Sequence, residues 1–133
     1  MRIRAIIVDG ERILLIERKK QNRHYWVFPG GGVESSDITP EAALVRECRE
    51  ELGVVVRVGK LYDTYKGDED ELFYLCRIAS GVIGKIGGPE STRDPAIWGQ
   101  YKPVWLTIAE IADKNVLPEQ IKSAILDRGV GIS

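Results

Sequence analysis

Between residues 39 and 53 the sequence carries a full set of helix start and stop signals. Thr39 can cap the first turn, and Pro40 suits the first helical position because its fixed φ matches a helix and its missing N–H is not needed there. Gly53 is placed to end the helix, since glycine adopts the left-handed conformation at low cost. An apolar face lies between these limits at spacings of three and four, and it consists of Leu44, Val45, Cys48 and Leu52. We therefore predict a helix over residues 40–52 that packs this face on the core.

Another side of the same helix is acidic. Glu47, Glu50 and Glu51 occupy positions i, i+3 and i+4, so their carboxylates share one face. Their mutual repulsion opposes the helix by roughly 0.2–0.5 kcal/mol per exposed pair, and by roughly 3 kcal/mol where the face is partly enclosed. We expect Arg46 and Arg49 to offset part of it while pointing away from the centre of the face. A divalent cation would remove the conflict, because Mg²⁺ and Mn²⁺ prefer oxygen ligands. The alternative, for the helix alone, is a solvated acidic surface.

Short apolar runs before the helix predict strands. Residues 2–8 and 12–17 are separated by Asp9-Gly10, which is typical of a two-residue hairpin turn. A polar loop over residues 18–23 then leads to a short strand at residues 25–28, which Pro29 ends. Three consecutive glycines, residues 30–32, follow. Because glycine is costly inside a helix or strand, we expect a loop there, whose backbone N–H groups can approach a phosphate.

The chain after the helix is also rich in predicted strands. We expect strands at residues 54–65, 71–79, 82–86 and 101–106, with a long polar loop over residues 87–99. The last of these strands contains Pro103, which indicates an edge or bulged strand. Thr107 and Glu110 have the capping-box spacing for a short helix, and a final helix is predicted over residues 118–127. The fold class is therefore α+β, with a mixed sheet packed between helices.

The composition limits the kinds of partner. The 133 residues fit one domain, residues 1–133, and 19 basic against 20 acidic residues give a formal charge of −1. A chain this close to neutral has no bulk attraction to a long nucleic acid or an anionic membrane. A small phosphorylated molecule, held by a local site, remains open.

The cysteines and the first apolar run bear on the compartment. Cys48 and Cys76 do not form a spaced metal pair, and we predict that both are buried free thiols. Residues 5–8 are far shorter than the apolar core of a signal peptide, and no stretch approaches the ~20 apolar residues that a membrane helix needs. We therefore expect a cytoplasmic protein, as a monomer or a homodimer.

Together, the glycines and the acidic helix form a known pattern. The segment resembles the Nudix box, G-x5-E-x7-R-E-U-x-E-E-x-G-U, in which U is a bulky aliphatic residue. Gly31 begins the match, and residues 46–54 supply the whole second half, with Cys48 at a position that is usually aliphatic. The preceding residues 26–34 are also similar to the lead-in of this MutT-like family. The resemblance implies a Nudix-type α/β/α sandwich with a mixed β-sheet between helices.

The match to the box has two departures. Asp37 stands where the first glutamate is usual, and the stretch from Asp37 to Arg46 is one residue longer, with Ile38 as the insertion. In the family the first acid braces the loop against the box arginine. The departures therefore concern the geometry of the loop, and Glu34 is a second candidate for the brace.

The resemblance also implies an activity and residue roles. Nudix hydrolases use Mg²⁺ or Mn²⁺ to cleave the phosphoanhydride bond of a nucleoside diphosphate linked to another group X. By match to the box, Glu47, Glu50 and Glu51 hold the metal, and one of these glutamates is the candidate general base. Arg46 orients Glu47 or the loop. Gly31 and Gly32 shape the loop against the substrate, and we assign the carbonyl of Gly31 to the metal shell as well.

Several residues outside the box are further candidates. Many relatives use an additional acid from a downstream loop, for which we choose Glu90, with Asp94 second; both also fit ordinary exposed loop acids. Arg23 and His24 precede the glycines and can contact phosphates, or else are surface residues. A base-stacking ring is sought among aromatic residues that fit the core equally well, whereas Trp26 and Trp105 are assigned to the core. The stacking candidates are Tyr25, Phe73, Tyr74, Trp98 and Tyr101.

The substrate class stays broad. A nucleoside triphosphate, a dinucleoside polyphosphate and a nucleotide sugar all fit. Relatives that act on ADP-ribose often carry a proline about fifteen residues past the box, and none occurs between Gly53 and Pro89. Two other classes are weighed: a non-catalytic nucleotide-binding sensor with a Nudix fold, which usually loses box glutamates, and a structural domain with a solvated acidic helix.

Overall fold

The computed structural model describes residues 1–83 and 100–131, and within them eight strands form one mixed sheet. The order along the sheet is β5-β6-β1-β2-β3-β8, with β4 paired to β1 and β7 paired to β2. The β1–β6 and β3–β8 pairs are parallel and the others antiparallel. The elements are β1 (Arg2–Asp9), β2 (Arg12–Lys20), β3 (Arg23–Val27), β4 (Gly30–Gly32), α1 (Pro40–Leu52), β5 (Val54–Lys66), β6 (Asp70–Gly81), β7 (Gln100–Thr107), α3 (Ile108–Ala112), β8 (Val116–Leu117) and α4 (Glu119–Arg128).

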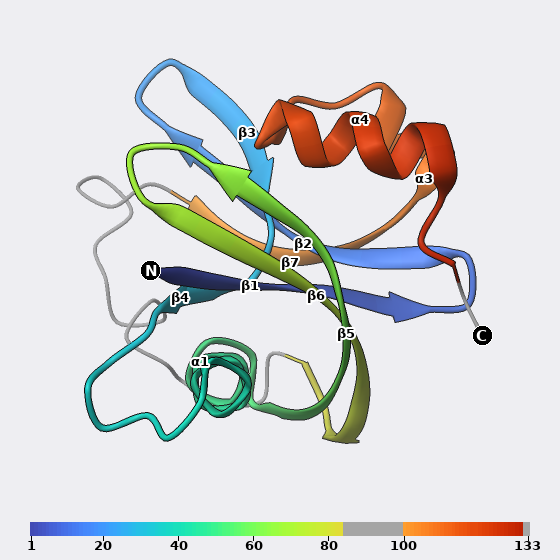
Figure 1. Ribbon diagram of the computed structural model, residues 1–133. Helices are drawn as coiled ribbons and strands as arrows, with labels where there is room; N and C mark the ends of the chain where they lie inside the picture. The colour runs from blue at the N-terminus through green and yellow to red at the C-terminus, as the bar shows by residue number, and fades with distance from the viewer. Residues whose placement is uncertain (84–99, 132–133) are drawn as a thin grey trace.

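Helices cover both faces of the sheet, which confirms the α+β architecture. Helix α1 lies on one face, and α3 and α4 lie on the other (Figure 1). Strand β1 divides its side chains between the two cores because neighbouring residues of a strand point to opposite faces. Ile3 and Ile7 pack with the buried residues of α1, whereas Ile6 and Val8 pack with Ile121 of α4 and the rest of the other cluster.

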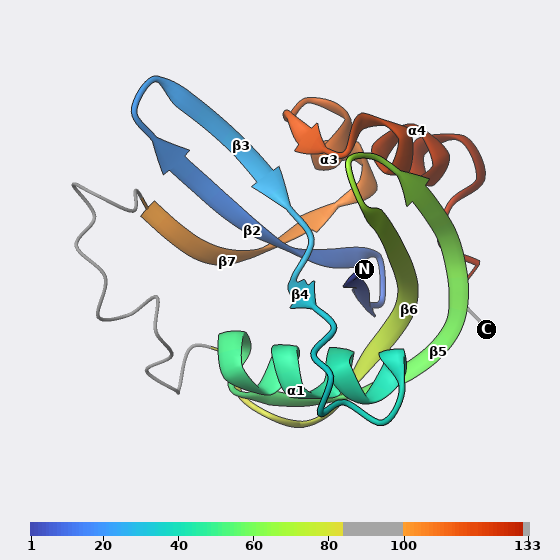
Figure 2. The same ribbon diagram turned by 60° about the vertical axis from the view of Figure 1, so that its left-hand side comes forward.

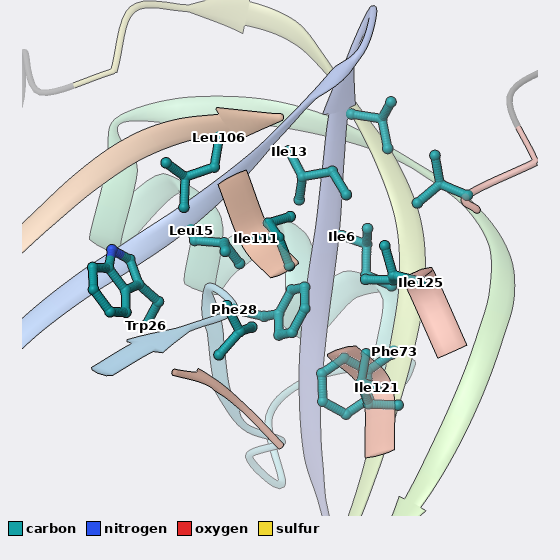
Figure 3. Packing of buried hydrophobic residues seen from close by; sticks show 13 residues of the cluster. Ile6, Ile13, Leu15, Trp26, Phe28, Phe73, Leu106, Ile111, Ile121 and Ile125 are labelled. Atoms are coloured by element: carbon teal, nitrogen blue, oxygen red, sulfur yellow. The ribbon is translucent and has the colours of Figure 1, made fainter. Parts of the chain in front are cut away.

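The core beneath α3 and α4 is built mainly from aliphatic side chains and two phenylalanines. Phe28 and Phe73 meet edge to face with ring centroids 5.4 Å apart, and Trp26 lies at the margin of the same cluster (Figure 3). Burial of Trp26 confirms its assignment to the core. Phe73 is fully buried, so its candidacy as a base-stacking ring was wrong.

The helix and hairpin predictions hold closely. Helix α1 has Thr39 as its N-cap, Pro40 in its first turn and Gly53 in the left-handed conformation at its end. Asp9 pairs with Arg12 across the predicted hairpin turn. Strand β7 pairs only with β2 among the described residues, as an edge strand containing Pro103 should. The capping box at Thr107 is present in α3.

Other boundaries differ from the prediction. The polar loop expected over residues 18–23 is a tight turn, because β2 continues to Lys20, which pairs with Arg23, and Gln21 takes a φ of 55°. Strand β6 continues through Gly81, while residues 84–86 of the next predicted strand and the loop at 87–99 lie outside the described residues. The two-residue strand β8 carried no sequence signal that we recognised.

The glycine triplet is the main correction to the predicted fold. Residues 30–32 form β4 instead of a loop and pair antiparallel with β1, Gly30 lying opposite Arg4. Gly30 has a φ of 144°, and a Cβ atom there would lie 2.0 Å from the carbonyl oxygen of Ile3. The close approach of two backbones, which only glycine allows, outweighs the usual cost of glycine in a strand.

The cysteines behave as predicted, and both are buried and free. Burial raises the pKa of the Cys76 thiol to about 12 and that of Cys48 still further, so neither is a reactive thiolate at neutral pH. No helix in residues 1–83 or 100–131 has the length and apolar character needed to cross a membrane.

Candidate active site

Strand β4 brings the glycines directly against the acidic face of α1. The backbone N–H of Gly30 donates to Glu51 Oε1 at 2.8 Å. Gly31 lies so close to Glu47 that a Cβ atom on the glycine would be 2.5 Å from the carboxyl carbon. Figure 2 shows β4 and the chain that follows it lying across α1. Two of the three predicted glutamates are therefore held at the glycine strand.

Arg46 lies at the centre of this acidic group, so the expectation that it points away was wrong. Its guanidinium donates to both carboxylate oxygens of Asp37 at 3.0 and 2.9 Å, and to Glu47 Oε1 at 3.0 Å. It also donates to the Gly32 carbonyl at 3.2 Å and to Glu50 Oε2 at 3.4 Å. A guanidinium with five donors can join several acids at once, which explains why the side chain turns toward them. The hydrogen bond to Asp37 contributes most to raising the pKa of Arg46 further above its usual range.

The two departures from the box pattern are accommodated within the loop. Asp37 retains the bracing role, since its bidentate bond to Arg46 and the bond from the Glu34 N–H at 2.8 Å hold the pKa of Asp37 below its usual value. The extra residue, Ile38, is accommodated at the surface of the loop, where it is 92% exposed. Glu34 reaches Arg46 only at 3.7 Å, so it supplements this brace.

Glu51 is a largely buried carboxylate with a hydrogen-bond donor at each oxygen. Each of its oxygens accepts a bond, Oε1 from Gly30 N–H and Oε2 from the hydroxyl of Tyr101 at 2.5 Å. Burial raises the pKa of Glu51 to about 7, the charge of Glu47 adds to the rise, and the two donors oppose it. The sequence marks Tyr101 only as a candidate stacking ring. Nothing in its spacing could reveal a bond to a residue fifty positions earlier.

The donor set fits a divalent cation of the Mg²⁺ or Mn²⁺ type. It consists of carboxylate oxygens, and the pKa of Glu51 is raised partly by the neighbouring charge of Glu47, a conflict that a cation would relieve. As the side chains stand, no three His, Cys, Asp or Glu residues in the described parts of the chain converge as a metal cluster. Each glutamate instead faces a protein donor: Arg46 for Glu47 and Glu50, and Gly30 with Tyr101 for Glu51.

A cleft of about 390 Å³ is lined in part by a residue of β1 that pairs with the glycine strand. Arg4, which pairs with Gly30 across the sheet, lies in its wall and donates to the Phe28 carbonyl and, at 3.0 Å, to Glu71 Oε1. Arg4 is missing from the residues that we predict for the site, although a charged residue inside an apolar strand is a visible signal in the sequence. The cleft is lined by Arg4, Val27, Phe28, Tyr65, Glu71, Phe73, Leu117, Pro118 and Glu119.

The remaining candidates are not gathered at the glutamates. Arg23 and His24 lie at the hairpin end of β3, whereas the glycines follow its other end (Figure 2). Arg23 stacks over Tyr25, with its guanidinium carbon 4.5 Å from the ring centroid, and His24 contacts Glu17 Oε2 at 2.6 Å. The half-buried residues Tyr74 and Trp105 pack against the core on the α1 side. Glu90, Asp94 and Trp98 lie outside the described residues.

Comparison with known proteins identifies the family. A family model described as the NUDIX domain matches residues 1–124. The chain belongs to the Nudix family. The match extends well beyond the box, to most of the sheet and to α4. The Nudix fold positions Gly30, Gly31 and the box glutamates as described above.

Curated relatives of this Nudix chain include two with named activities. It is 34% identical over 122 residues to an ADP-ribose pyrophosphatase of Methanocaldococcus jannaschii, covering 86% of this chain and 65% of that protein. It is 38% identical over 67 residues to an 8-oxo-dGTP diphosphatase of Proteus vulgaris, covering 48% of this chain and 59% of that protein. The chain thus spans less than two thirds of either relative.

A solved structure supports the fold. The E. coli ORF135 protein superposes with a TM-score of 0.68 at 23% identity, covering 99% of this chain and 93% of that one. At this level of identity the likeness concerns the fold, in agreement with the Nudix sandwich that the box implied.

Proposed function

We propose that this Nudix protein is a metal-dependent pyrophosphohydrolase that cleaves the phosphoanhydride bond of a nucleoside diphosphate linked to another group. The observation that carries the proposal is the pair Glu47 and Glu51, held against the Gly30–Gly31 backbone. A bound Mg²⁺ or Mn²⁺ would neutralise the diphosphate and activate water. Glu47, Glu50 and Glu51 would hold the ion, with the Gly31 carbonyl as a further ligand.

The protein groups around these ligands have separate tasks. Arg46 fixes Glu47 through a bond at 3.0 Å and ties the loop to the helix through Asp37. Burial raises the pKa of Glu51 to about 7 while no cation is bound, so this carboxylate exchanges a proton near neutral pH before it binds the metal. Retention of all three glutamates favours an enzyme over a nucleotide sensor.

The cleft beside Gly30 is the proposed site for the nucleoside. Tyr65 is the half-buried aromatic residue in its lining, and Arg4 and Glu71 provide polar groups. The relatives' names, ADP-ribose pyrophosphatase and 8-oxo-dGTP diphosphatase, both denote nucleoside diphosphate derivatives, which supports the class and leaves the group X open. ADP-ribose stays a candidate despite the missing proline.

A substrate panel with product identification tests the proposal. Nucleoside triphosphates, oxidised dGTP, dinucleoside polyphosphates, nucleotide sugars and ADP-ribose are incubated with Mg²⁺ or Mn²⁺, and the products are resolved by chromatography. The proposal requires metal-dependent cleavage of at least one compound at an anhydride bond. Tight nucleotide binding without cleavage of any of them would favour the sensor instead.

Replacing Asp37 tests the brace. Asp37→Asn removes the charge that holds Arg46 at 2.9–3.0 Å, so Arg46 no longer fixes Glu47, and we expect kcat/KM to fall by about 10–100-fold. Steady-state kinetics measure the change. Glu34→Gln is the matched control, because Glu34 contacts the same guanidinium only at 3.7 Å and should cost little. Equal losses in both variants would contradict the assignment of Asp37.

The pH dependence of metal affinity provides a further prediction. Glu51 has a pKa of about 7, so below pH 7 a proton must leave before the carboxylate can bind a cation. We expect the apparent Mn²⁺ affinity to rise by up to about tenfold per pH unit between pH 5.5 and 7, and to level off above. Titrations followed by electron paramagnetic resonance measure it. An affinity that does not change over this range would count against Glu51 as a ligand.

A further inference from the structure

We propose that Tyr101 is a positioning residue that orients the carboxylate of Glu51 toward the bound cation. This inference rests on the proposed function, because it concerns how one of the proposed ligands is held. Tyr101 lies outside the Nudix box, on strand β7. This strand pairs with β2, whereas β6 and β5 lie on the other side of β1.

The contact to Glu51 defines the orientation of its carboxylate. Tyr101 donates to Oε2 at 2.5 Å, and the Gly30 N–H donates to Oε1 at 2.8 Å. A carboxylate that accepts one bond at each oxygen cannot rotate about its last torsion without losing both. Each oxygen of an ionised carboxylate still keeps a lone pair, so the two donors fix the group without occupying all of its binding capacity.

The sheet holds Tyr101 firmly enough for this role. Tyr101 pairs with Arg18 in the β2–β7 register, which runs without a shift from Gln100 to Thr107. The guanidinium carbon of Arg18 lies 5.4 Å from the centroid of the Tyr101 ring, and Arg18 Nε donates to the Gln100 carbonyl at 3.3 Å. The phenol is therefore placed by a regular strand and a cation–π contact.

The proposed role predicts a loss of metal affinity when the hydroxyl is removed. Partners that hydrogen-bond a metal ligand typically change metal affinity by about 10–100-fold when they are lost. We expect Tyr101→Phe to raise the Mn²⁺ dissociation constant by that factor in the absence of nucleotide. The KM for the nucleotide at saturating metal should not change, because the hydroxyl faces Glu51 and not the cleft.

A matched tyrosine elsewhere provides the control. Tyr62 donates to the Gly129 carbonyl at 2.5 Å and accepts from Arg128 Nε at 3.4 Å. Tyr62→Phe therefore removes an equally short hydrogen bond, together with this weaker one, away from the proposed metal ligands. Mn²⁺ titrations of the full chain, followed by electron paramagnetic resonance, compare the unaltered protein with both variants, and thermal unfolding of each measures the structural cost.

The outcomes separate this inference from the proposed function. Weaker Mn²⁺ binding by Tyr101→Phe alone, with similar unfolding temperatures for the two variants, supports the positioning role. Equal Mn²⁺ affinity of Tyr101→Phe and the unaltered protein overturns it and leaves the proposed function standing. Absence of Mn²⁺ binding by the unaltered protein overturns the proposed function, and the positioning role with it.

Discussion

Glu51→Gln is expected to lower kcat by about 10²–10⁴-fold, the range typical of a lost general base, because it removes a charged ligand and a proton acceptor at once. The side chain stays the same length, so the bond from the Gly30 N–H can be retained by the amide oxygen. Tyr101 can then accept from the amide instead of donating. Steady-state kinetics at saturating metal and substrate measure the loss. Full activity in this variant would contradict the proposed role of Glu51.

The same substitution should stabilise the metal-free protein at neutral pH. Burial raises the pKa of Glu51 from 4.5 to about 7, so between these values the folded state holds a proton that the unfolded state has released. Stability therefore falls as pH rises from 4.5 to 7, by roughly 3 kcal/mol in total, and the cost is complete above pH 7. Glutamine carries no charge, so the variant does not lose stability over this pH range. Urea denaturation at pH 4.5 and pH 8 should show the variant gaining stability over the unaltered protein only at pH 8.

Glu50→Gln is the matched control on the same helix. The Glu50 side chain is 54% exposed and contacts Arg46 at 3.4 Å. It is proposed as a metal ligand too, so activity should fall, but without burial there is no stability to gain. A gain at pH 8 in both variants would show that relief of repulsion along the helix, rather than burial of Glu51, is the cause.

Helix α1 could be predicted because its signals are local. The Thr39 hydroxyl accepts from the Ala42 N–H at 3.0 Å, and the Gly53 N–H donates to the Arg49 carbonyl at 3.0 Å. Each of these contacts joins residues three or four positions apart, so the spacing that makes the helix is visible in the sequence. The acidic face and the apolar face follow from the same periodicity.

The partners of that acidic face could not be predicted in the same way. Tyr101 reaches Glu51 from fifty residues away, and Gly30 becomes a strand residue only because β1 lies beside it. Arg46 illustrates a different limit. Arg46 lies on helix α1 as predicted. The direction of its long side chain depends on which acids the fold brings near it, and one of them, Asp37, belongs to the loop before the helix. Local sequence propensities therefore determine the helix that carries the glutamates, whereas contacts between residues far apart in the sequence determine their hydrogen-bond partners.

Gly30→Ala is expected to cost at least about 3 kcal/mol of unfolding free energy and to abolish activity. The φ of 144° is strained for any residue with a Cβ, which alone costs on the order of 1–3 kcal/mol. The added methyl would also lie 2.0 Å from the Ile3 carbonyl oxygen and 2.9 Å from Arg4 Cα, both backbone atoms that cannot turn aside. Strand β4 would have to separate from β1, and Glu51 would lose one of its two donors, the Gly30 N–H. Urea denaturation and the activity assay measure both losses.

The neighbouring glycines make the test specific. Gly32→Ala places a methyl with nothing within 4 Å and should change stability by no more than about 0.5 kcal/mol. Gly31→Ala places one 2.5 Å from the Glu47 carboxyl carbon, the far end of a flexible side chain that can move. We therefore expect Gly31→Ala to weaken Mn²⁺ binding and activity with little loss of stability. The three substitutions are chemically identical. If Gly30→Ala loses stability, Gly31→Ala loses metal binding and Gly32→Ala loses neither, the difference can arise only from the position of each residue against β1 and α1. An equal response at all three would mean that general backbone flexibility, and not close approach, explains the triplet.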